Sequence, residues 1–191
     1  MKITCYLFFS MLLALSSMAW AQVQKNQSVY QLESSWTDQN GKKINLKEFR
    51  GKPLILAMVY TSCQAACPLI VSDLQKIAAV LPQPIREKTQ FALFSFDPGR
   101  DTAAQLKKFA AAHDLDQKSW TLLTSSSGAV RELAAVLGMK YRKDPNGDFS
   151  HSNVITILDA DGVIRHRQEG LSQDPRTSAQ VVVGLFATPG N

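Results

Sequence analysis

A pair of cysteines stands where two contrasting segments of the sequence meet. Cys63 and Cys67 follow an apolar run over residues 54–59, which is typical of a buried strand. Pro68 then opens a segment up to residue 77 that reads as a helix. Proline suits the first turn of a helix, because the N–H that it lacks has no partner there. The sequence therefore predicts a strand that turns into a helix at the cysteines, where free N–H groups and the helix dipole stabilise a thiolate.

Strands and helices alternate along the rest of the chain. A hairpin with its turn at 38–41 is expected near the N-terminus. The other predicted elements are strands over 90–96 and 120–123, helices over 102–109 and 128–137, a polar loop around 144–147, a hairpin over 154–166 and a helix over 178–186. This order predicts an α/β sandwich with a central mixed β-sheet flanked by helices and an N-terminal β-hairpin.

The first 21 residues have the parts of a secretory signal peptide. Lys2 gives a positive start, an apolar core covers 6–15, and Ala19-Trp20-Ala21 fits the rule for cleavage between small residues. The apolar stretch is short for a spanning helix, and an uncleaved anchor is the alternative. We expect residues 1–21 to be removed together with Cys5, which leaves one domain over 22–191 that is periplasmic or secreted and has no stable membrane span.

Composition excludes one class of partner and leaves the role of the cysteines open. The net charge is +5, but the basic residues are scattered, so we expect no nucleic acid partner. Cys63 and Cys67 could form a structural disulfide, although so small a loop would constrain the unfolded chain little. They could be a redox pair, although thioredoxin-type pairs have two intervening residues rather than three. They could also bind a soft metal ion, above all Cu(I).

Three histidines are candidates for a further metal ligand. His113 lies near the end of a predicted helix, and His166 lies between two arginines on a polar strand. His151 directly precedes the strand that begins at residue 154. Residues in loops at strand ends often bind ligands, which gives His151 a modest preference.

Four motifs resemble the Sco/SenC family in order and spacing. They are Gly51-Lys52-Pro53-Leu54-Ile55-Leu56, Tyr60-Thr61-Ser62-Cys63 through Cys67-Pro68, Ser95-Phe96-Asp97-Pro98-Gly99-Arg100-Asp101-Thr102, and His151-Ser152 ahead of Leu158-Asp159-Ala160-Asp161-Gly162. The resemblance implies a thioredoxin-like fold that binds one copper ion, Cu(I) and/or Cu(II). The ligands that it implies are Cys63, Cys67 and His151. It also implies a role in delivering copper to the copper centre of cytochrome c oxidase or in reducing the cysteines of that centre. The function that we expect is a metallochaperone, a binding protein rather than an enzyme. Such a protein would serve the copper centre of cytochrome c oxidase, in its subunit II, or another periplasmic copper protein.

The sequence departs from the family pattern beside both parts of this implied site. Family members usually have a proline and an acidic residue between the cysteines, where this chain has Gln64-Ala65-Ala66. Many have aspartate directly before the histidine, where this chain has Ser150, with Asp148 further back.

A thiol-disulfide oxidoreductase is the competing function. In it Cys63 would attack and Cys67 would resolve the mixed disulfide. Copper binding needs His151 and dithiol exchange does not, so this histidine distinguishes the two functions. For either function we expect both cysteines at the exposed start of the helix.

Overall fold

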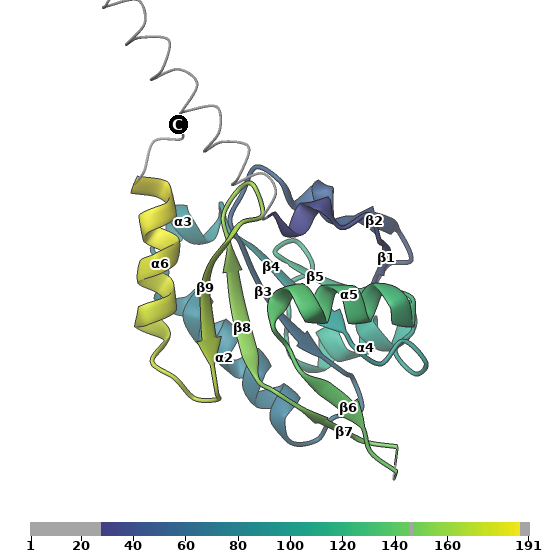
Figure 1. Cartoon of the computed structure of the whole chain (residues 1–191). Coiled ribbons are helices and arrows are strands. Elements are labelled where there is room, and N and C mark those ends of the chain that lie inside the picture. Colours follow the sequence, from purple (N-terminus) through teal and green to yellow (C-terminus); the bar gives the residue numbers. More distant parts are fainter. Residues whose placement is uncertain (1–27, 146, 188–191) are drawn as a thin grey trace, which may run out of the picture.

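The fold is built on one mixed sheet of seven strands (Figure 1). A computed structural model describes residues 28–145 and 147–187, so the predicted signal peptide and Cys5 lie outside the described residues. In spatial order the strands are β2 (Lys43–Asn45), β1 (Ser35–Asp38), β5 (Trp120–Thr124), β4 (Gln90–Ser95), β3 (Leu54–Val59), β8 (Val154–Leu158) and β9 (Ile164–Glu169). β3, β4 and β5 are parallel, and the other neighbours are antiparallel. The mixed sheet and the N-terminal hairpin of β1 and β2 confirm the predicted fold class.

Helices cover both faces of the sheet. They are α2 (Ala66–Val80), α3 (Gln83–Arg86), α4 (Ala103–Ala112), α5 (Ser127–Leu137) and α6 (Pro175–Ala187), with 3-10 turns η1 (Val29–Gln31) and η2 (Leu46–Phe49). In Figure 1, α5 lies in front of the sheet and α2 and α4 lie behind it. Helix α6 packs beside α2. The sequence analysis did not predict α3 or the two 3-10 turns. Within the described residues, no helix has the length and apolar character needed to cross a membrane.

The predicted helix ends are set by local hydrogen bonds. Thr102 caps α4, since its side chain accepts a hydrogen bond from the N–H of Gln105. Ser126 caps α5 in the same way through the N–H of Ala129. Gly138 ends α5 in the left-handed conformation, at a φ of 71° that favours glycine.

The strand before the cysteines lies at the centre of the core. All six residues of β3 are buried, because β4 and β8 pair with its two edges and helices cover its faces. This burial explains why the segment reads as a continuous apolar run rather than as an alternating one. A rigid central strand therefore ends directly before the cysteine segment.

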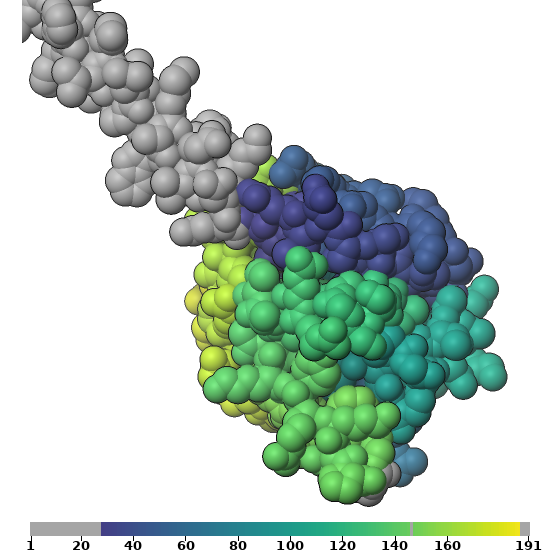
Figure 2. Space-filling model, turned by 45° about the vertical axis from the view of Figure 1, so that its right-hand side comes forward, coloured from purple at the N-terminus to yellow at the C-terminus, as the bar shows by residue number. Residues whose placement is uncertain are grey.

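A second, two-stranded sheet stands apart from the main one. β6 (Tyr141–Lys143) pairs with β7 (Phe149–His151), where a polar loop was expected. The loop predicted around 144–147 is the turn that joins these two strands. The sequence analysis did not predict the strands themselves, because strands of three residues are too short to show an alternating pattern. Figure 2 shows this hairpin, in green, standing out from the body of the molecule at the lower edge. Its last residue is the candidate ligand His151.

Candidate metal centre

The two cysteines occupy the junction between β3 and α2, as the sequence predicted. Cys63 lies in the connecting loop, and Cys67 lies in the first turn of α2, which begins at Ala66. The expected exposure of both cysteines was wrong: Cys63 is 8% exposed and Cys67 is 0% exposed. The early start of the helix explains the difference. Cys67 is already helical and shares the buried stripe of α2 with Ile70 and Leu74.

The start of the helix makes the two thiols chemically unequal. Both cysteines are free thiols, and the backbone N–H of Cys67 donates a hydrogen bond to the sulfur of Cys63. Burial disfavours the Cys63 thiolate, but hydrogen bonds from the backbone of Cys67 and Ala65 outweigh it and lower the pKa of Cys63 below its ordinary value. Burial raises the pKa of Cys67, and the nearby Cys63 raises it further. Cys63 is therefore the thiol that ionises first.

The structure brings His151 to the cysteines. The two sulfur atoms and one ring nitrogen of His151 all lie within 4.8 Å of one another. Among residues 28–145 and 147–187, no other group of cysteine, histidine and acidic side chains has this arrangement. The Nδ1 atom of His151 is 3.2 Å from the carbonyl oxygen of Ser152. Since a carbonyl only accepts, this contact places the proton on Nδ1 and leaves the lone pair on Nε2.

The other two histidines lie elsewhere. His113 caps the C-terminal end of α4, and its ring packs against Phe109 at 4.3 Å between centroids. His166 lies on the edge strand β9, opposite Ile157 of β8. Neither belongs to the group formed by the cysteines and His151.

Aromatic side chains surround His151. Its ring lies 5.1 Å from that of Phe96 and 6.0 Å, edge-on, from that of Tyr60. Phe149, on the same strand as His151, contacts Tyr60 and Phe96 at 5.2 Å and 5.3 Å. The sequence analysis missed this cluster, because its members come from three separate segments of the chain.

A buried carboxylate holds the loop that leads to Cys63. Asp101, which is 1% exposed, accepts hydrogen bonds from the backbone N–H and the hydroxyl of Thr61. It also accepts one from the hydroxyl of Ser95 at the end of β4. Asp101 thereby fixes the loop to the neighbouring strand. The sequence contained it in a family motif but gave no sign of this contact.

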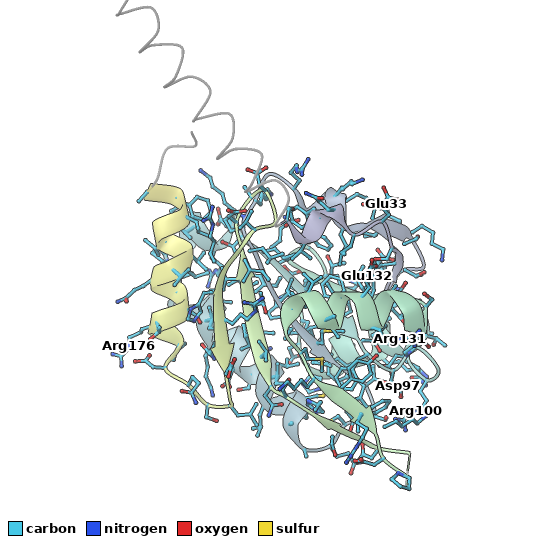
Figure 3. All side chains as sticks on the ribbon, viewed as in Figure 1. Glu33, Asp97, Arg100, Arg131, Glu132 and Arg176 are labelled. Carbon is cyan, nitrogen blue, oxygen red and sulfur yellow. The ribbon has the colours of Figure 1, made fainter. Side chains whose placement is uncertain are left out.

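An arginine lies beside the hairpin that carries His151. The guanidinium group of Arg100 pairs with the carboxylate of Asp97. It also lies over the rings of Tyr60 and Phe149, at 5.8 Å and 5.7 Å from their centroids. Figure 3 shows Asp97 and Arg100 together at this side of the molecule, near β6 and β7. The arginine packs on aromatic side chains from both parts of the site.

This arrangement permits two kinds of chemistry. Two thiolates and an imidazole form a donor set that could hold a soft metal ion such as Cu(I). The two thiols alone could instead be oxidised to a disulfide, since one ionises readily and the other lies beside it. The nearby imidazole is needed for the first of these and not for the second.

Comparisons with known proteins identify the family. The SCO1/SenC family model matches residues 22–186. The SCO1 protein homolog of Bacillus subtilis is 28% identical over 153 residues, which cover 76% of this chain and 77% of the relative. The structure of Arabidopsis thaliana ScoI with copper bound has a TM-score of 0.69 at 22% identity, over 81% of this chain and 96% of that one.

A further solved structure is similar over most of its length. It is that of BsSco, described as a member of the Sco family of cytochrome c oxidase assembly proteins. Its TM-score is 0.69 at 23% identity, over 79% of this chain and 90% of that one. These structures share the fold of the chain, and the resemblance inferred from the four sequence motifs is confirmed. The chain belongs to the SCO1/SenC family.

Proposed function

We propose that this protein is a periplasmic copper metallochaperone that holds one copper ion through Cys63, Cys67 and His151. The observation that carries the proposal is the group of three donor atoms within 4.8 Å of one another. Membership of the family supports it, as does the copper found in the Arabidopsis relative of the same fold. Copper is here the cargo of the protein rather than a resident cofactor.

The donor set suits the capture and release of Cu(I). Thiolates are soft ligands that favour this ion, and an imidazole also suits copper. Because the pKa of Cys67 is raised by burial, binding must displace the proton of its thiol. A site with only three protein donors leaves room for a ligand from a recipient protein, so copper can pass by ligand exchange.

The proposed recipient is the copper centre of cytochrome c oxidase, in subunit II, or another periplasmic copper protein. The description of BsSco as an oxidase assembly protein supports the first choice. A thiol-disulfide oxidoreductase acting on the recipient's cysteines is the second candidate function. The unequal pKa values of Cys63 and Cys67 favour it, since one thiol can attack while the other stays protonated.

Export is part of the proposal. Residues 1–21 would direct the chain across the membrane and then be removed, leaving a domain that begins at Gln22. The intact mass of the periplasmic protein tests this directly. A mature species that still contains Met1 or Cys5 would contradict it.

A His151→Ala variant separates the two candidate functions. We expect it to bind copper more weakly and to lose the ability to support oxidase assembly in a strain that lacks the wild-type protein. Its cysteines should still form a disulfide. The matched control is His166→Ala, which removes an imidazole far along the sheet and should behave like the wild type. If His151→Ala supports assembly fully while Cys63→Ser does not, the oxidoreductase function is favoured instead.

A further inference from the structure

The two halves of the proposed site come from parts of the fold that are not joined by a common sheet. The cysteines follow β3 in the main sheet, whereas His151 ends β7 in the separate hairpin. An isolated two-stranded hairpin is marginally stable in water, so its position depends on contacts with the body of the protein. β8 begins three residues after His151 and pairs with β3, which brings the histidine to the cysteine end of that strand. The contacts between the hairpin and the cysteine segment then decide how His151 faces the two sulfur atoms.

We infer that a hydrogen bond from the Tyr60 hydroxyl to the Asp148 carboxylate positions His151 against the two cysteines. We call this pair the Tyr60–Asp148 latch. The inference rests on the proposed ligand set, and it assigns both latch residues as positioning residues rather than ligands.

The latch joins the cysteine segment to the hairpin close to the three proposed ligands. Tyr60 directly follows β3, three residues before Cys63, and is 2% exposed. Asp148 directly precedes β7, three residues before His151. The hydroxyl of Tyr60 donates a hydrogen bond to Oδ1 of Asp148, across 88 positions of sequence. The contact thus links the start of the loop that carries Cys63 to the start of β7, the strand that carries His151.

The other side-chain contacts between the hairpin and the cysteine segment are less directional than the latch. The rings of Phe149 and His151 pack against Tyr60 and Phe96, and such packing tolerates sliding. A hydrogen bond with an ionised acceptor is directional and stronger than a neutral one. The Asp148 side chain also accepts a hydrogen bond from the N–H of Phe149, which orients the carboxylate on its own strand.

This chain has no carboxylate among Gln64-Ala65-Ala66 and none at Ser150. Asp148 instead brings a carboxylate to the hydroxyl of Tyr60, at the start of the cysteine segment. A nearby acidic group is therefore present in this chain.

The test is a double-mutant cycle with copper affinity as the measurement. Tyr60→Phe keeps the ring and removes the donor, and Asp148→Ala removes the acceptor. We expect each variant to bind Cu(I) about 3- to 10-fold more weakly in competition with a chromophoric chelator, since a single hydrogen bond is worth about that much. Tyr60→Phe also removes a hydrogen bond from the Tyr60 hydroxyl to Cys63, so it should be the weaker single variant. The double variant should bind no more weakly than Tyr60→Phe, because Asp148 acts only through the Tyr60 hydroxyl.

Two controls and a spectrum make the test specific to positioning. Asp148→Asn keeps a side-chain oxygen that can accept from Tyr60, so it should restore most of the affinity. Asp144→Ala removes an equal charge from the same hairpin, where Asp144 bonds to Ser150 rather than to Tyr60, and should change the affinity less. In the Cu(II) complex, Asp148→Ala should weaken the nitrogen hyperfine signal of His151, whereas Asp144→Ala should not.

The outcomes separate the latch from the ligand set. If His151→Ala binds copper as well as the wild type does, the ligand set is wrong and the latch is rejected with it. If His151→Ala weakens binding but the effects of Tyr60→Phe and Asp148→Ala are absent or simply additive, the latch alone is overturned. Circular dichroism of each variant excludes a loss of fold as the cause.

Discussion

The backbone N–H of Cys67 donates a hydrogen bond to the sulfur of Cys63 across 3.4 Å. This contact uses one of the N–H groups that have no partner at the start of a helix, and it favours a negative charge on the accepting sulfur. The second sulfur has the opposite environment, because Cys67 is completely buried. A single helix start therefore produces one reactive thiol and one protected thiol.

This inequality predicts the order of alkylation. In the reduced, metal-free protein, iodoacetamide should modify Cys63 before Cys67, because Cys63 has the lower pKa and the greater exposure. Peptide mass spectrometry after short reaction times measures the order. Equal or faster modification of Cys67 would contradict the assignment.

The lowered pKa of Cys63 also predicts a pH dependence. The rate of Cys63 alkylation should reach half its maximum below pH about 8.5, the ordinary value for a cysteine. Because this pKa is depressed by folding, the Cys63 thiolate stabilises the folded state above the pKa of the unfolded chain. That contribution is lost as the pH falls through the folded-state pKa. A Cys67→Ser variant leaves Cys63 as the thiol that is alkylated. A midpoint of its alkylation rate above the pKa of free cysteine would contradict the prediction.

The buried carboxylate of Asp101 should contribute strongly to stability. In Asp101→Ala, the N–H and hydroxyl of Thr61 and the hydroxyl of Ser95 lose their acceptor. We expect the free energy of unfolding to fall by about 2–3 kcal/mol, the usual cost of leaving buried polar groups unpaired. Urea unfolding measures the change. Asp161→Ala, at an exposed aspartate whose carboxylate lies 3.9 Å from Arg50, is the control and should change stability by less than about 0.5 kcal/mol. Similar losses in both variants would refute the role of Asp101.

Two glycines with the same backbone conformation provide a matched test of packing at the end of the sheet remote from the cysteines. Gly162 and Gly41 have φ values of 83° and 84°. A Cβ at Gly162 would lie 2.4 Å from the ring of Tyr30, whereas one at Gly41 would meet nothing within 4 Å. Gly41→Ala should cost about 1–2 kcal/mol from backbone strain alone. Gly162→Ala should cost at least about 1 kcal/mol more, from overpacking. Equal melting temperatures for the two variants would show that Tyr30 is not packed against Gly162.

The sequence predicted the elements whose residues carry a strong local signal. The run over β3 is wholly apolar because the strand is wholly buried. The cap at Thr102 and the glycine at 138 each act within one helix end. The cap at Ser126 was not predicted. The hairpin of β6 and β7 has short, mostly polar strands, so its pattern resembles a loop. The burial of Cys67 was missed because it depends on a helix that begins two residues before Pro68.

The donor residues of the candidate site could be predicted from the sequence, but the residues that hold those donors in place could not. Cys63, Cys67 and His151 were singled out by residue type and by the family motifs, and the structure places them together. Tyr60, Asp101 and Asp148 act through contacts between distant segments, such as the hydrogen bond across 88 positions. No local pattern of charge or hydrophobicity records such a contact, so only the folded structure reveals it.

A copper titration tests the three-donor copper site most directly. The reduced domain over 22–191 would be titrated with Cu(I) against a competing chelator, alongside Cys63→Ser, Cys67→Ser, His151→Ala and the controls His113→Ala and His166→Ala. We predict one copper ion per chain, loss of tight binding in either cysteine variant, weaker binding in His151→Ala and wild-type binding in both controls. Tight binding that survives the loss of either cysteine, or that depends on His113 or His166 rather than His151, would contradict the account.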